Sequence, residues 1–235
     1  MKNSYFNYAL LIMSAVCFLS CNGNEITQSI TFIPDLTEDY FTGFTGKDIR
    51  KMSSITSNSN NGENLRIVPV TDIGFNQSFE LQLPKIDNIL MSNNYNRVYE
   101  TSDYFKQVDS VLLKFMTDTI TRNSSVIFKI LSEELNSLSE SLSDRKLLVT
   151  NTDFMEKSFI NFYETGSLQF IQEKPKALDS ILLQKYPLND LSGIEVIFVY
   201  LPLNRIDSER YEIISGFYKR LLESKNARVK IVGSL

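Results

Sequence analysis

Short apolar runs alternate with longer amphipathic segments along most of this 235-residue chain, and this alternation constrains the fold more than any other feature. The most apolar run, residues 195–201, has the length and the β-branched and aromatic content of a buried strand. Residues 208–224 follow it with Ile214, Phe217 and Leu221 on one stripe, as expected of a helix. Such alternation predicts parallel strands joined by helical crossovers.

The same two patterns recur from residue 29 onward. The predicted strands are 29–33, 65–70, 78–83, 146–150, 195–201 and 228–232, and the predicted helices are 46–54, 102–117, 126–142, 171–184 and 208–224. The run 78–83 alternates with a period of two, which indicates an edge strand with one wet face. We therefore expect a doubly wound α/β fold, with a mostly parallel sheet, one antiparallel edge strand and helices on both faces.

The first residues have the features of an export signal. Lys2 precedes an apolar run from residue 8 to 18, which is too short for the ~20 residues of a membrane-spanning helix. Ser20 and Cys21 follow, and this ending resembles the lipobox of bacterial lipoproteins, in which the chain is cleaved on the N-terminal side of the cysteine and the cysteine is acylated. We expect a signal peptide at 1–20, a lipidated tether at 21–28 and one domain at 29–235. An ordinary cleaved signal or an uncleaved anchor is the alternative.

Composition narrows the functions open to the domain. With 43% hydrophobic and 22% charged residues, the chain has the composition of a folded protein. A net charge of -4 without a polybasic block makes nucleic acid an unexpected partner. The chain has no histidine, which excludes Ser-His-Asp catalysis, Cys-His catalysis and His-ligated zinc. Both cysteines, Cys17 and Cys21, belong to the predicted export segment, so we expect no disulfide in the domain.

Oxygen-bearing side chains follow two predicted strands and precede one predicted helix. Asp35 and Thr37 come after the first strand, Asp153 after the fourth, and Ser125 directly before the third helix. In a doubly wound sheet, ligands bind at the carboxyl ends of the strands, where the strand order reverses. Mg²⁺ and Ca²⁺ prefer carboxylate and hydroxyl oxygens. Asp35, Thr37, Ser125 and Asp153 are therefore candidate ligands of Mg²⁺ or Ca²⁺.

This arrangement resembles the von Willebrand factor A (VWA) fold from about residue 30 to 232. Asp35-Leu36-Thr37-Glu38-Asp39 stands where that family has the Asp-x-Ser-x-Ser loop of its metal-ion-dependent adhesion site. Ser125 stands in place of the family's threonine, and Asp153 in place of its later aspartate. Asp39, which replaces the second serine, makes the site degenerate. The resemblance implies a binding module, not an enzyme, that recognises an acidic residue of a protein partner in the cell envelope through the bound ion.

Other interpretations of these residues stay open. An aspartate or threonine after a strand also caps helices and stabilises turns, so the chain could be a metal-free structural or interaction lipoprotein. In a metal-dependent phosphatase Asp35 would be the nucleophile, but such enzymes usually have a second aspartate where Thr37 stands. Asn22 is not the aspartate of an inner-membrane retention signal, which favours the outer membrane.

Three smaller expectations concern single segments. We expect Ser124 to be the N-cap of the helix at 126–142. We expect Glu133 and Glu134 to lie on a solvated face of that helix. We expect the aromatic cluster of Tyr40, Phe41 and Phe44 to pack against the sheet.

Overall fold

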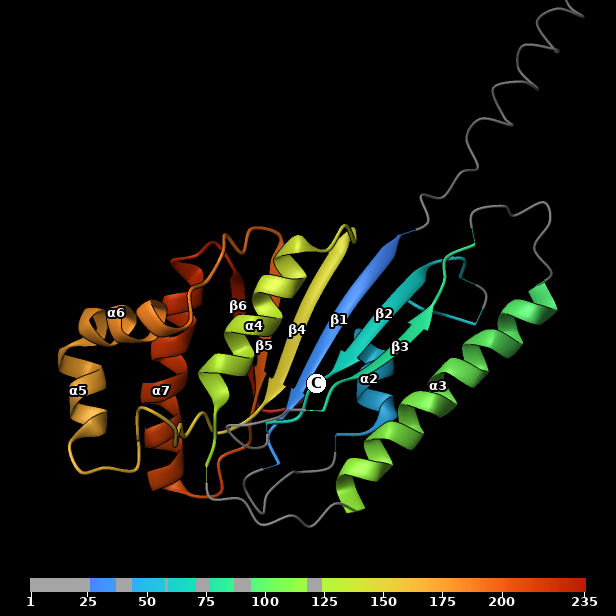
Figure 1. The fold of residues 1–235 in the computed structure, drawn as a ribbon. Coiled ribbons are helices and arrows are strands. Elements are labelled where there is room, and N and C mark those ends of the chain that lie inside the picture. The colour runs from blue at the N-terminus through green and yellow to red at the C-terminus, as the bar shows by residue number, and fades with distance from the viewer. Residues whose placement is uncertain (1–25, 37–43, 58, 71–76, 87–93, 118–123) are drawn as a thin grey trace, which may run out of the picture.

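The described strands form one sheet. The computed structural model describes residues 26–36, 44–57, 59–70, 77–86, 94–117 and 124–235 (Figure 1). Within them the strands are β1 (Thr27–Pro34), β2 (Gly62–Ile67), β3 (Phe79–Leu83), β4 (Arg145–Asn151), β5 (Ile194–Val199) and β6 (Arg228–Val232). Their order is β3-β2-β1-β4-β5-β6, and every neighbouring pair is parallel except β2 and β3. The predicted parallel sheet with one antiparallel edge strand is confirmed.

Helices cover both faces of this sheet, as predicted. They are α2 (Gly46–Met52), α3 (Asn94–Thr117), α4 (Ile127–Glu140), α5 (Ser167–Glu173), α6 (Pro175–Lys185) and α7 (Arg205–Glu223). One buried cluster packs α2 and α3 against one face of the sheet. A second packs α4, α5, α6 and α7 against the other face. None of the described helices combines the length and the hydrophobicity needed to cross a membrane.

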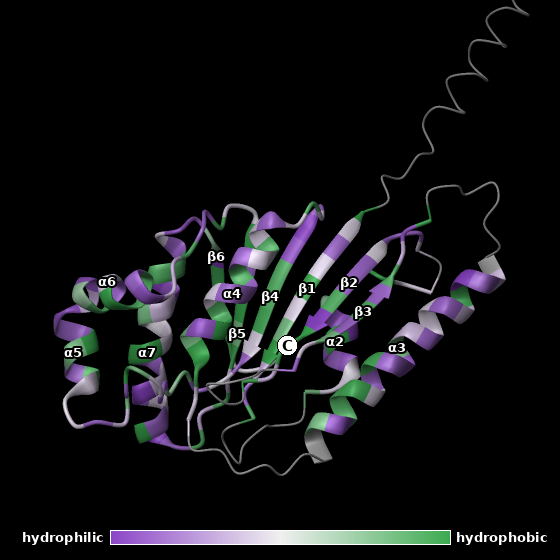
Figure 2. Ribbon diagram, viewed as in Figure 1, coloured by the Kyte–Doolittle hydropathy of each residue, from purple (hydrophilic) through white to green (hydrophobic). Residues whose placement is uncertain are grey.

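The central strands are apolar on both sides because both sides are covered. In β4, Leu147 and Val149 pack toward α2 and α3, while Leu148 packs toward α4 and α7. All three side chains are fully buried. Figure 2 shows the middle of β4 in the hydrophobic colour, whereas α3 and α6 alternate hydrophobic and hydrophilic residues. This difference is what a buried parallel strand and a surface helix require.

Element boundaries differ from the predictions where no apolar pattern marks them. The predicted helix 171–184 is two helices, α5 and α6, because Pro175 cannot donate the backbone hydrogen bond that would continue α5. Helix α3 begins at Asn94, earlier than predicted, since its first turns expose Tyr95 and Tyr99 and so carry no apolar stripe. Strand β1 begins at Thr27, inside the predicted tether.

Two side-chain predictions have opposite outcomes. Phe44 is buried and stacks on Phe32 with ring centroids 4.3 Å apart, so its predicted packing role is confirmed; Tyr40 and Phe41 lie outside the described residues. Glu134 was expected in solvent but is buried, where it accepts hydrogen bonds from Arg66 Nε at 2.7 Å and Nη2 at 3.2 Å. Its partner lies on β2, which the sequence of α4 alone could not indicate.

Candidate functional site at the switch point of the sheet

The strand order reverses between β1 and β4. The chain passes from β1 to β2 and β3 on one side of the sheet, and from β4 to β5 and β6 on the other. In open α/β sheets this reversal leaves a crevice at the carboxyl ends of the two central strands, where ligands bind. We call residues 34–36, 124–126 and 151–158 the switch-point rim; it lies at the arrowhead ends of β1 and β4 in Figure 1.

Asp35 is held at the rim by the segment that follows β4. Its backbone N–H donates to the carbonyl of Asn151 at 2.9 Å, which extends the β1–β4 pairing by one residue. The hydroxyl of Thr152 donates to Asp35 Oδ2 at 2.5 Å. Asp35 is 4% exposed, and this hydrogen bond satisfies part of its carboxylate. The first and fourth strands thus bring the predicted acidic segments side by side.

Asp153 folds back onto its own segment. Its Oδ1 accepts a hydrogen bond from the backbone N–H of Met155 at 2.8 Å, an Asx-turn, and the side chain is buried. Thr152 Oγ1 accepts a second local bond from the backbone N–H of Phe154 at 3.0 Å. Phe154 has φ of 62°, a left-handed conformation that is unusual for a bulky residue. This turn buries every residue from 151 to 156.

Ser125 reaches the same rim from the loop before α4. Its backbone pairs with that of Lys157 through N–H to carbonyl bonds of 3.1 Å and 2.9 Å, and its side chain is buried. The structure therefore joins Asp35, Ser125 and Asp153 through neighbouring segments of one rim. Thr37 and Cys21 lie outside the described residues.

Glu156 is a rim residue that the sequence reasoning missed. Its Oε2 accepts hydrogen bonds from the backbone N–H groups of Ile127 at 3.0 Å and Phe128 at 2.8 Å, the first two residues of α4. These groups have no partner inside the helix, so the carboxylate acts as its cap. The prediction that Ser124 is the N-cap is wrong, because Val126 holds that position without a side-chain bond.

The environment of Glu156 disfavours its charge. The side chain is fully buried, and burial raises its pKa to about 7, with the nearby charge of Asp35 acting in the same direction. Hydrogen bonds from Ser158 and from the two backbone N–H groups oppose this shift. No local sequence pattern marks this role, because the N–H groups that Glu156 caps lie 29 and 28 residues earlier in the chain.

Three buried hydroxyls beside the rim lack a hydrogen-bond partner within the described residues. They are Tyr211 Oη and Tyr218 Oη on α7 and Thr150 Oγ1 on β4. Burial raises the pKa of Tyr211, and the charge of Asp153 raises it further. The ring centroid of Tyr211 lies 6.2 Å from that of Phe154, the residue that follows Asp153. Buried polar groups in native proteins nearly always have a partner, commonly water or a bound group. The rim therefore has unused hydrogen-bonding capacity next to Asp153.

The oxygen atoms at the rim are of the type that binds a hard cation, but few carboxylates contribute them. Two carboxylates and the Ser125 hydroxyl are oxygen ligands of the kind that Mg²⁺ and Ca²⁺ prefer. Within the described ranges, however, no three Asp, Glu, Cys or His side chains are grouped so that they could hold a metal ion. A cation at the rim would therefore depend on hydroxyl oxygens as well as on the two aspartates.

Comparison with known proteins adds only distant likenesses. No protein-family model and no curated protein matches the sequence. Among solved structures, the chain is similar to a mutant of the PilB minor pilin from Streptococcus sanguinis, with 11% identity, a TM-score of 0.47, and coverage of 91% of this chain and 58% of that one. It is also similar to the conserved hypothetical protein BatB from Bacteroides thetaiotaomicron, with 9% identity, a TM-score of 0.38, and coverage of 89% and 91%. Both likenesses are too remote to support an argument about function.

Proposed function

We propose that this chain is a binding module of VWA type that recognises a protein partner at the switch-point rim. The observation that carries the proposal is the junction of Asp35 after β1 with Thr152 and Asp153 after β4. These segments are far apart in sequence, yet they meet where wound sheets bind ligands.

We further propose that Mg²⁺ or Ca²⁺ takes part in this recognition. Asp35 and Asp153 would hold the ion, with hydroxyl oxygens from Ser125 and Thr37. The orphaned hydroxyl of Tyr211 beside Asp153 supports a further polar group at this place, such as a water bound to the ion. The ion would give the rim an electrophilic centre suited to a carboxylate of the partner.

A metal-free module of the same fold is the second candidate. It is favoured by the internal hydrogen bonds of both aspartates, Thr152 to Asp35 and Met155 to Asp153, which are those of a turn that needs no ion. The side chain of Glu156 supports it too, since its oxygen already accepts the hydrogen bonds of the N–H groups at the start of α4 without any ion. In this form the rim would hold its partner by hydrogen bonds and packing alone.

Cation binding separates the two candidates. We expect millimolar Mg²⁺ or Ca²⁺ to release heat in isothermal titration and to stabilise the chain by about 2–3 kcal/mol at one hundred times the Kd. Asp153→Asn keeps an oxygen that can accept from Met155 but removes the charge, so it should lose this gain while matching wild type in chelator. Asp109→Asn, on an exposed side chain of α3, is the matched control and should keep the gain.

The opposite pattern would identify the metal-free candidate. In that case no cation produces heat or a shift in the unfolding midpoint. Asp153→Ala then lowers stability equally with cation and with chelator, because only the turn is lost.

We also propose that acylated Cys21 anchors the module in the cell envelope, with the outer membrane favoured by Asn22. Strand β1 begins at Thr27 and reaches the rim at its other end, so the rim would face away from the bilayer (Figure 1). Cells fed labelled palmitate should incorporate the label into wild type and Cys17→Ser but not into Cys21→Ser, because acylation requires the thiol of Cys21. Equal labelling of the two variants would exclude the anchor.

A further inference from the structure

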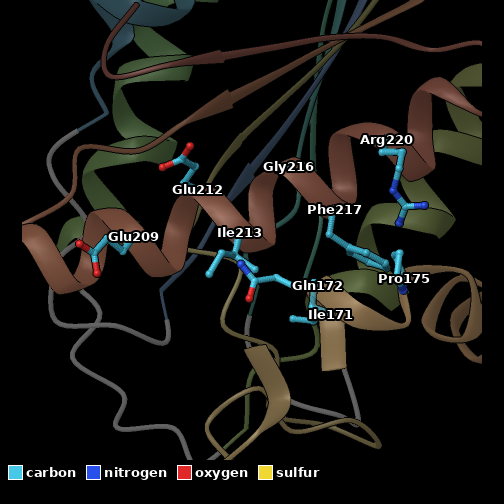
Figure 3. Close-up of a pocket in the computed structure, with 9 residues that line it drawn as sticks. All are labelled: Ile171, Gln172, Pro175, Glu209, Glu212, Ile213, Gly216, Phe217 and Arg220. Carbon is cyan, nitrogen blue, oxygen red and sulfur yellow. The ribbon is translucent and has the colours of Figure 1, made fainter. Parts of the chain in front are cut away.

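A groove runs along the outer side of α7, away from the switch-point rim. It has a volume of about 640 Å³ and lies between α7 and the corner where α5 meets α6. Figure 3 shows the side chain of Phe217 extending from α7 toward Pro175 at the start of α6. Ile213 on α7 and Ile171 on α5 line the same groove. Glu209 and Glu212 stand at one end of this stretch, and Arg220 stands at the other. The groove thus has an apolar middle and charged ends.

Gly216 lies in the middle of the groove, and the fold gives no reason for a glycine there. It is exposed, it lies well inside α7, and a Cβ atom built on it would meet no atom within 4 Å. Glycine weakens a helix interior relative to alanine, because its backbone loses more freedom on folding. The property that glycine adds at such a position is close access to the backbone. Here that access opens onto the groove.

At the acidic end of the groove, the charge of Glu212 is not paired with any described residue. Glu212 is exposed and makes no hydrogen bond or ion pair with any residue in the described part of the chain. It lies beyond the first turn of α7, where the helix dipole no longer favours a negative charge. Glu209 pairs with Arg205 at 2.8 Å, but both side chains are largely in solvent. At the far end Asp179 holds Arg220 at 3.1 Å. The complementary ligand therefore carries positive charge at one end.

We infer that this groove is a docking site for a segment of a partner protein, with a lysine or arginine facing Glu212 and an apolar side chain over Gly216. Apolar contact with Ile213 and Pro175, which are both partly exposed, would supply affinity, and the charge of Glu212 would set the direction of the segment. The site is separate from the rim and needs no cation, so it adds a second recognition surface to the proposed module.

A displayed random-peptide library, panned on the chain from residue 22 onward, tests this inference. Gly216→Leu fills the groove, and Ser110→Leu places the same side chain at an exposed position of α3, outside it. Panning on wild type with depletion on Gly216→Leu should enrich peptides that pair a basic residue with an apolar one. By fluorescence anisotropy, a synthesised member should bind Gly216→Leu and Glu212→Lys at least about tenfold more weakly than wild type. It should bind Ser110→Leu unchanged.

Folding of the variants is checked separately. Gly216→Ala should raise the unfolding midpoint, because alanine favours the helix and meets no atom there. The inference is overturned if the enriched peptides are acidic, or if none depends on position 216. It is also overturned if wild type forms a dimer that Gly216→Leu abolishes, since the groove would then hold a second copy of the chain.

Discussion

Replacing Glu156 with alanine is expected to lower the free energy of unfolding by about 3 kcal/mol at pH 6. The change removes the acceptor for the N–H groups of Ile127 and Phe128, which are buried at the start of α4. It also removes the side-chain link between α4 and the segment after β4, and leaves the backbone pairing of Ser125 with Lys157. Glu156→Gln is the matched control, because its amide oxygen can accept the same two bonds, and we expect it to stay within about 1 kcal/mol of wild type. Urea unfolding measures both variants; equal losses would show that the cap contributes nothing.

The same residue should make wild-type stability depend on pH. Burial raises the pKa of Glu156 from its ordinary 4.5 to about 7, so between these values the folded chain binds a proton that the unfolded chain releases. Its stabilising contribution is full below pH 4.5 and is lost as pH rises through 7, by about 3 kcal/mol in total. The ionisable groups that interact with it are Asp35, Tyr186 and Tyr218.

Glu156→Gln should remove this dependence. The difference in free energy of unfolding between wild type and Glu156→Gln should shift in favour of the variant between pH 5 and pH 8. Parallel stability curves for the two proteins over that range would contradict the assignment of the raised pKa to Glu156.

Replacing Phe154 with alanine is expected to lower the free energy of unfolding by about 4 kcal/mol. The ring is fully buried behind the rim, with its centroid 4.5 Å from that of Phe198, 5.0 Å from Tyr218 and 6.2 Å from Tyr211. Removing it leaves a cavity between β4, β5 and α7 and deletes three aromatic contacts. Phe170→Ala, at a position 37% exposed, should lose less than about 1 kcal/mol.

Replacing Phe154 with glycine tests the backbone conformation of this residue. In most buried positions glycine is less stable than alanine, but at φ of 62° it adopts the backbone without strain. Phe154→Gly should therefore be no less stable than Phe154→Ala in the same urea experiment. If the glycine variant proves about 1 kcal/mol less stable, the left-handed conformation of this residue is refuted.

The fold follows from the sequence because its pattern is local. In β5 and α7 the apolar residues repeat with the periods of a buried strand and an amphipathic helix, and both elements lie within three residues of their predicted bounds. Pro175 marks the break between α5 and α6 in the sequence. The apolar stripe from 171 to 184 continues across it, however, and so predicts a single helix. Where exposed residues form a helix, as at the start of α3, no such pattern exists.

The rim is only partly predictable from the sequence, because some of its contacts join residues that are far apart in the chain. Asp35 and Asp153 could be placed from the general rule that wound sheets bind ligands at strand ends. Glu156 could not, because its partners are 28 and 29 residues away in sequence and depend on how α4 meets the turn after β4. The burial of Glu134 depends in the same way on Arg66, 68 residues away. Long-range hydrogen bonds of this kind leave no local spacing to detect.

The central claim is that the switch-point rim is the ligand site and holds a cation. Titration of ¹⁵N-labelled chain with Mn²⁺ tests it most directly, because the paramagnetic ion broadens the NMR signals of nearby amides. We predict that the amides of Asp35, Thr152 and Asp153 broaden first, while those of Gly62 and Arg145 at the opposite end of the sheet stay sharp. Broadening that begins at that opposite end, or that is uniform over the chain, would contradict the claim.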